Sequence, residues 1–265
     1  MIKTLQLLLI LFIISANYSQ AQSYKFVYRL NFRADSTKIE DIKTELFTLY
    51  LNESISVFAS QNKILIDSLR SETKNNQSLG LSLIANLSSV PRTKFKFVIF
   101  KNRQFKTCVT RQKVLSDNFE YEEPIDGFKW ELKNDTISLL GYKCKTASTK
   151  YCGRTYKAWY GEQVPISDGP YKFTGLPGLI FKIVDLKNNF DFELIGIQKW
   201  DNKLPQLNNE QIIKTTKTKF IKANNSFSEN YVNIAAQNGL ILSDEGKKFM
   251  SEKNKLENTN PIELE

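Results

Sequence analysis

The chain contains no histidine, and it contains only three cysteines among its 265 residues. The absence of histidine excludes Ser-His-Asp and Cys-His catalysis, a histidine general base and every histidine-ligated metal site. The cysteines show no Cys-x-x-Cys spacing, which disfavours a metal site made of cysteines alone. Glycine spacings typical of a Walker or dinucleotide-binding loop are also missing. We therefore expect neither a metal nor a cofactor.

Long apolar runs are absent after the first twenty residues. Lys3 precedes an apolar run over residues 5–14, and Ser19-Gln20-Ala21 follows as a small-x-small cleavage site. This order is typical of a secretory signal peptide, and the run is shorter than the roughly 20 apolar residues of a membrane span. The sequence predicts cleavage after Ala21, export to the periplasm or the medium, and no transmembrane span in the mature chain. The residue directly after the cleavage site is Gln22 and not a cysteine, which disfavours a lipoprotein anchor.

Export changes the interpretation of the cysteines, because disulfides persist outside the cytoplasm. Cys144 and Cys152 flank the polar stretch 145–151. A hairpin folded at Ser148 would place them opposite each other, within disulfide reach. We predict this bridge. A bridge from Cys108 to either partner and three buried reduced thiols remain as alternatives.

The excess positive charge is concentrated in one stretch. The formal net charge is +9, and residues 90–113 contain eight Lys or Arg but no Asp or Glu. Within it, Phe95, Phe97 and Ile99 alternate with Lys94 and Lys96, the period of a β-strand. We define a basic stripe by six residues of this stretch: Arg92, Lys94, Lys96, Lys101, Arg103 and Lys106. The stripe suits an anionic partner such as lipid headgroups or an envelope polysaccharide, and the alternative is a solvated strand face. Export disfavours nucleic acid, despite the isoelectric point near 9.2.

The centre of the chain consists of short apolar or alternating segments separated by turn residues, which predicts strands. Expected strands lie at 24–34, 45–60, 95–100, 105–109, 119–122, 128–132, 137–146, 151–160, 179–185 and 190–197. Turns are expected at 124–127, at Asn134-Asp135 and at 187–189. Residues 63–74 predict a helix, and Ser228 and Ser243 are expected to cap two more in the Asn- and Lys-rich tail.

These elements predict a β-rich α+β fold. Short connections favour antiparallel pairing, so we expect a twisted antiparallel meander sheet, or a partly open barrel, with short and mostly C-terminal helices. We assign residues 22–200 to one β-rich domain. Residues 201–265 form a segment that packs on this domain or trails from it.

Residues 161–178 form an unusual loop, which contains four of the 11 glycines and three of the seven prolines. A flexible linker would be polar, but this loop carries Val164, Ile166, Tyr171, Phe173 and Leu176, and we expect it to pack on itself or on the sheet. Pro177-Gly178 predicts a type II turn.

This loop and the strands before it resemble a known family. Residues 175–180 read Gly-Leu-Pro-Gly-Leu-Ile, the hexapeptide that names the GLPGLI family of exported bacterial proteins. The resemblance is clearest over residues 128–198, with fainter support from the early strand and from Asn260-Pro261-Ile262-Glu263-Leu264. It includes Gly141-Tyr142-Lys143-Cys144-Lys145, Gly153-Arg154, Ala158-Trp159-Tyr160, Pro165-Ile166 and Asp168-Gly169-Pro170. Membership implies export, but no established reaction or ligand.

The functional prediction is a non-enzymatic envelope protein that binds a hydrophobic or amphipathic, lipid-like ligand or an envelope protein. Its candidate site is the motif loop with its neighbours: Trp159, Tyr160, Asp168, Tyr171, Phe173, Gly175, Leu176, Pro177, Gly178, Leu179 and Ile180. An architectural turn is the alternative role for this loop, and an ion pair of Arg154 with Asp168 or Asp185 is a structural possibility.

Two alternative functions remain. One is a structural or assembly adaptor that uses an exposed sheet edge or the loop. The other is a hydrolase with paired carboxylates or a Ser/Lys pair. Adjacent Glu122 and Glu123 point to opposite faces of a strand and do not form an acid/base pair. The Ser-x-x-Lys matches at Ser60 and Ser71 are as frequent as chance predicts.

Overall fold

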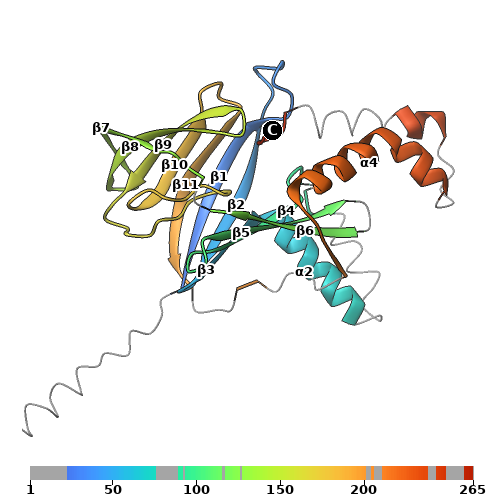
Figure 1. Cartoon of the computed structure of the whole chain (residues 1–265), viewed down its shortest axis with the longest axis horizontal. Helices are drawn as coiled ribbons and strands as arrows, with labels where there is room; N and C mark the ends of the chain where they lie inside the picture. The colour runs from blue at the N-terminus through green and yellow to red at the C-terminus, as the bar shows by residue number, and fades with distance from the viewer. Residues whose placement is uncertain are drawn as a thin grey trace, which may run out of the picture.

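The computed structural model describes residues 23–75, 89–91, 93–114, 117–125, 127–200, 204–205, 211–237, 243–248 and 260–264. About half of the described chain belongs to one twelve-stranded sheet (Figure 1). Its strands are β1 (Tyr24–Arg33), β2 (Ile42–Leu51), β3 (Ile55–Ser60), β4 (Phe97–Asn102), β5 (Thr107–Val114), β6 (Asp117–Pro124), β7 (Glu131–Leu139), β8 (Tyr142–Tyr151), β9 (Arg154–Gly161), β10 (Leu179–Asp185), β11 (Phe190–Lys199) and β12 (Ile212–Lys214). The longer helices are α2 (Gln61–Asn75) and α4 (Lys217–Gln237).

The sheet consists of two antiparallel meanders joined side by side. Its order is β12-β6-β5-β4-β3-β2-β1-β11-β10-β9-β8-β7, so β1–β6 form one meander and β7–β11 the other. The ten-residue strands β1 and β11 pair along almost their whole length and join the two. The pairings are antiparallel except for β12 with β6. The predicted antiparallel meander is confirmed, and the sheet is not closed, because β12 and β7 lie at its two ends.

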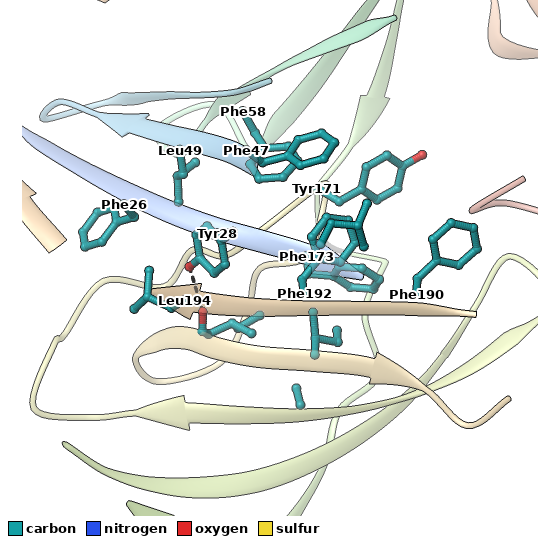
Figure 2. Packing of buried hydrophobic residues seen from close by; sticks show 14 of the residues in the cluster. Phe26, Tyr28, Phe47, Leu49, Phe58, Tyr171, Phe173, Phe190, Phe192 and Leu194 are labelled. Atoms are coloured by element: carbon teal, nitrogen blue, oxygen red, sulfur yellow. Dashed lines mark hydrogen bonds between the residues drawn. The ribbon is translucent and has the colours of Figure 1, made fainter. Parts of the chain in front are cut away.

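The sheet is strongly bent, and Figure 1 shows β4–β6 running at a steep angle to β1, β10 and β11. We call the face toward which it bends the inner face. This face carries aromatic side chains from both meanders, including Phe26, Tyr28, Phe47 and Phe192 (Figure 2). The Phe47 ring stacks on Phe58 with centroids 5.1 Å apart, and its edge contacts Phe192 at 5.8 Å. Aromatic contacts of this kind hold the two meanders together.

The central strands are buried on both faces. Tyr50, Val57, Ala59 and Val98 point to the outer face, where Ile64 of α2 packs against them. The alternation follows the strand period of two, since Phe58 and Val57 belong to opposite clusters. The predicted helix at 63–74 is therefore α2, and it covers the outer side of β2 and β3.

Two predicted turns are wrong, at Asn134-Asp135 and at Ser148, and Ser148 lies inside β8. Asn134-Asp135 lies inside β7, where the register with β8 shifts between Lys133 and Thr136, so these residues form a bulge. The chain reverses instead at Leu140-Gly141 and at Cys152-Gly153, with φ of 50° and 80°, and of 42° and 74°. Two successive residues with positive φ match the right-handed twist of a tight hairpin.

The C-terminal segment holds one confirmed and one wrong helix cap. Ser228 lies inside α4, whose first turn places Phe220 against Phe119 and Tyr121 of β6. Ser243 caps the short helix that follows, because its Oγ accepts a hydrogen bond from the N–H of Gly246 at 3.1 Å.

Candidate binding loop and its buried anchors

Residues 162–178, between β9 and β10, pass across the inner face of the sheet. Tyr171 packs edge-on against Phe97 of β4 with ring centroids 5.3 Å apart, and Phe173 packs against Tyr156 of β9 at 4.8 Å. The loop therefore contacts strands from both meanders. The tyrosine hydroxyl of Tyr28, in β1, donates to the carbonyl of Ile180 at 2.7 Å, just after the loop (Figure 2). The side of the sheet that would have to enclose a ligand is covered here by the chain itself.

A buried ion pair anchors the middle of the loop to the sheet. Asp168 lies 2.5 Å from the ammonium group of Lys101 in β4, and neither side chain is accessible to solvent. The Asp168 carboxylate also accepts hydrogen bonds from the Ser56 hydroxyl at 2.6 Å and from the N–H of Gly169 at 2.7 Å. Lys101 donates in addition to the carbonyls of Gly169 and Tyr171. Both charges are thus fully coordinated, as buried charges must be.

The hexapeptide ends the loop with a close approach between backbones. A Cβ on Gly178 would lie 2.3 Å from the carbonyl oxygen of Gly161, so only glycine fits. The predicted type II turn at Pro177-Gly178 is wrong, because φ of Gly178 is 158° instead of about 80°. Leu179, the first residue of β10, pairs directly with Gly161, the last residue of β9.

Most of the predicted site residues are buried. Tyr160, Asp168, Tyr171, Phe173, Leu176, Gly178, Leu179 and Ile180 are buried, Trp159 is half-buried, and Gly175 and Pro177 are exposed. Trp130, before β7, donates its indole N–H to the carbonyl of Thr174 at 2.8 Å and holds the loop from the other side. The motif thus builds the protein interior, and the exposed part of the loop consists of six residues. We call this the outer ridge: Glu162, Gln163, Pro165, Ser167, Gly175 and Pro177.

The basic stripe does not form one surface. Lys101 is buried in the ion pair, and the Arg103 guanidinium donates to the carbonyls of Asn52 and Glu53. Lys94 donates to the carbonyls of Ala34 and Asn260, while Lys106 is exposed. Lys96 is half-buried. Arg92 lies outside the described residues.

The sequence does not reveal the role of the C-terminal residues 260–264, which insert beside the loop. Ile262 is 6% exposed and belongs to the main core. Arg154 of β9 donates to the side-chain oxygen of Asn260 at 2.6 Å and to the carbonyls of Pro261 and Ile262. It also pairs with Asp185 at 3.4 Å, which confirms one of the two partners expected for it. The faint family resemblance of this segment was the one signal in the sequence.

Glu263 forms the centre of a second buried charge cluster. Its carboxylate lies 2.7 Å from both Lys172 of the loop and Lys217 of α4, and it accepts hydrogen bonds from the hydroxyls of Tyr151 and Tyr171. Glu123 of β6 contacts the same two lysines at 2.5 and 2.9 Å. We call these six residues the Glu263 cluster.

The cluster strongly favours the charged form of Glu263. Burial raises the pKa of this carboxyl, but the two ammonium groups and the tyrosine hydroxyl of Tyr171 outweigh it, and the pKa falls to about 2. Burial lowers the pKa of Lys172 and Lys217, but Glu263 and Glu123, joined by Tyr121 at Lys172, together outweigh it, so each pKa lies above its usual value. Two cations and two carboxylates leave the cluster neutral.

The predicted bridge between Cys144 and Cys152 is wrong, and all three cysteines are free. Because the β8–β9 hairpin turns at Cys152-Gly153 and not at Ser148, Cys152 lies in the turn, and Cys144 lies near the far end of β8. Burial raises the pKa of both Cys108 and Cys144 to about 11, so their thiols stay protonated.

Metal-binding clusters and membrane-spanning helices are both absent from the described residues. These residues contain no group of three or more Cys, Asp or Glu arranged to hold a metal ion. Among the helices of the described part of the chain, none has the length and apolar composition needed to cross a membrane.

Known proteins resemble the chain in a short sequence stretch and in the fold. Residues 152–182 match a family described as "Protein of unknown function (Porph_ging)". No curated protein matches the sequence. Two structures of PNGF-II, in the P21 and C2 space groups, are similar with a TM-score of 0.55 each, at 17% and 16% identity. Each match covers 76% of this chain but only 33% and 32% of PNGF-II, so the chain spans about a third of that protein, and the likeness is one of fold.

Proposed function

We propose that this is an exported, non-enzymatic protein of the cell envelope that binds a protein partner through the outer ridge of the loop 162–178. The observation that carries the proposal is the anchoring of the ridge. Buried Asp168 and Lys101 hold the loop from below, and Trp130 holds it from the side. A loop that is already rigid loses little conformational entropy when it binds, which is what a recognition surface needs.

The same anchoring argues for a partner outside the sheet over a lipid-like ligand within it. Tyr171, Phe173 and Ile262 fill the inner face with the chain's own side chains. The matched family of unknown function and the GLPGLI motif support membership in an exported family. The likeness to a third of PNGF-II supports the idea that this fold works beside other domains.

Site-specific crosslinking tests the proposal. A photoreactive residue replaces exposed Pro165 on the outer ridge, and a matched variant carries it at exposed Ser36, in the β1–β2 connection. We expect a discrete protein adduct in intact cells from the first variant and not from the second. Equal labelling from both positions, or a stoichiometric lipid in native mass spectra of the purified chain, would contradict the proposal.

Export is tested separately by sequencing the N-terminus of the protein recovered outside the cytoplasm. We expect it to begin at Gln22. A chain that retains residues 1–21 in the cytoplasmic fraction would remove the envelope from the proposal.

A further inference from the structure

Residues 260–264 are held like a bound peptide. They belong to no strand, and their contacts are made mainly by individual side chains of other elements. Leu264 adds one backbone hydrogen bond, from its N–H to the carbonyl of Cys152 at 3.1 Å. The surroundings of the segment come from the end of β1, the β8–β9 hairpin, the loop 162–178 and the start of α4.

Asn260 and Ile262 of the segment make contacts of different chemistry. The Asn260 amide uses both ends: its oxygen accepts from Arg154, and its nitrogen donates to the carbonyl of Arg33 at 2.8 Å. Ile262 fills an apolar position of the core, and its carbonyl accepts from Arg154 and from the hydroxyl of Tyr156. A site that bonds both ends of a side-chain amide, or that pairs with a carboxylate, distinguishes one short sequence from another.

The Glu263 position requires an anion. Without that carboxylate, Lys172 and Lys217 would share only Glu123, and the buried cluster would carry a net charge of +1. The hydroxyls of Tyr151 and Tyr171 would also lose their acceptor. Uncompensated charge and unpaired donors in a buried site are costly, so the site favours a ligand that restores the carboxylate.

We propose that this is a peptide-binding site for an extended Asn-Pro-Ile-Glu segment, which the chain fills with its own residues 260–263. The same segment binds in trans when another polypeptide presents it. Covalent attachment raises the effective concentration of the segment at the site but adds no contact, so a free segment can make the same contacts. This site goes beyond the proposed function, which uses the outer ridge. The segment in trans comes from a second copy of this chain, which carries the same sequence.

The test uses the full chain with its own segment weakened by Glu263→Ala. The probe is a blocked synthetic peptide of residues 259–264, Thr-Asn-Pro-Ile-Glu-Leu, and the matched control peptide differs only by the change E263Q. We expect the first peptide to raise the melting temperature of the variant in a saturable way. Loss of the charge-assisted bonds should make the control peptide bind roughly 10- to 100-fold more weakly.

Binding of the two peptides with equal affinity, or no saturable binding up to about 1 mM, would overturn the proposal. If Glu263→Ala does not fold, Asn260→Ala serves as the host, because it keeps the carboxylate and loosens only the amide contacts. In that host the peptide must still bind more tightly than its E263Q control. Sedimentation of the wild-type chain then tests the source: a concentration-dependent dimer that excess peptide dissociates supports a second copy, and a chain that stays monomeric at every concentration would overturn it.

Discussion

The buried pair of Lys101 and Asp168 makes a quantitative prediction about the anchoring of the loop. In the variant Asp168→Asn, the side chain keeps its size and an acceptor for the Ser56 hydroxyl but loses its charge. Lys101, which is fully buried, then keeps only the carbonyls of Gly169 and Tyr171 as partners. Removing one partner of a buried ion pair costs about 3–5 kcal/mol.

That cost is a large fraction of the stability of a domain, which is about 5–15 kcal/mol, but the variant should still fold. The assay is urea denaturation followed by tryptophan fluorescence, since Trp130 contacts the loop directly. The variant Lys101→Met should be destabilised by a similar amount. The double variant should be destabilised by about 1–3 kcal/mol less than the sum of the two, because it removes both charges together.

An exposed pair provides the matched control. Lys145 and Glu162 are 46% and 45% exposed and lie at the edge of the same loop. The variant Glu162→Gln should lower the stability far less than Asp168→Asn does, because solvent screens such a pair. If Asp168→Asn costs no more than this control, or if its effect and that of Lys101→Met simply add, the ion pair does not anchor the loop.

Three further predictions concern the turn, the charge cluster and the thiols. Gly178→Ala should destabilise the protein by about 1–3 kcal/mol or more in the same denaturation assay, because its Cβ would meet the Gly161 carbonyl. Gly127→Ala is the control and should have little effect, because the space around Gly127 is open. The pKa of Glu263 is lowered from 4.5 to about 2, so its contribution, on the order of 3 kcal/mol, is present above pH 4.5 and lost as the pH falls toward 2. Denaturation curves measured between pH 4.5 and 2 should show this loss of stability in the wild type, and Glu263→Gln should not show it. If the stabilities of the two proteins fall in parallel with pH, the prediction is refuted. Thiol titration of the unfolded chain without reductant should find three free thiols, and a value near one would restore the disulfide.

Much of the strand content follows from the local pattern of the sequence. The alternation around Phe26, Tyr28 and Leu30 identifies β1, and Lys187-Asn188-Asn189 identifies the turn between β10 and β11. Such signals involve residues close together in the chain, where the period of two directly determines which side chain faces the core. Turns that depend on an unfavourable local conformation were missed, since positive φ at Leu140 and Cys152 arises from the twist of the hairpins.

In the candidate site, too, the sequence predicts the local features but not the contacts between distant residues. The composition of the loop 161–178 indicates that it packs against something, and this is confirmed. Its partners cannot be deduced from the sequence, because Asp168 meets Ser56 and Lys101, which lie more than sixty residues earlier. The basic stripe failed as a single surface for the same reason: a charge count along the chain does not show that one of its lysines is neutralised inside the core.

The sequence by itself determined the β-rich character and the antiparallel neighbours, because these depend on side-chain alternation and on short connections over a few residues. The tertiary structure alone decided that β1 pairs with β11, that the loop fills the inner face, and that Glu263 completes a neutral charge cluster with Lys172, Lys217 and Glu123. Such contacts form only when the whole sheet bends and buries charges from distant segments together, and desolvation then makes each charge dependent on its partners.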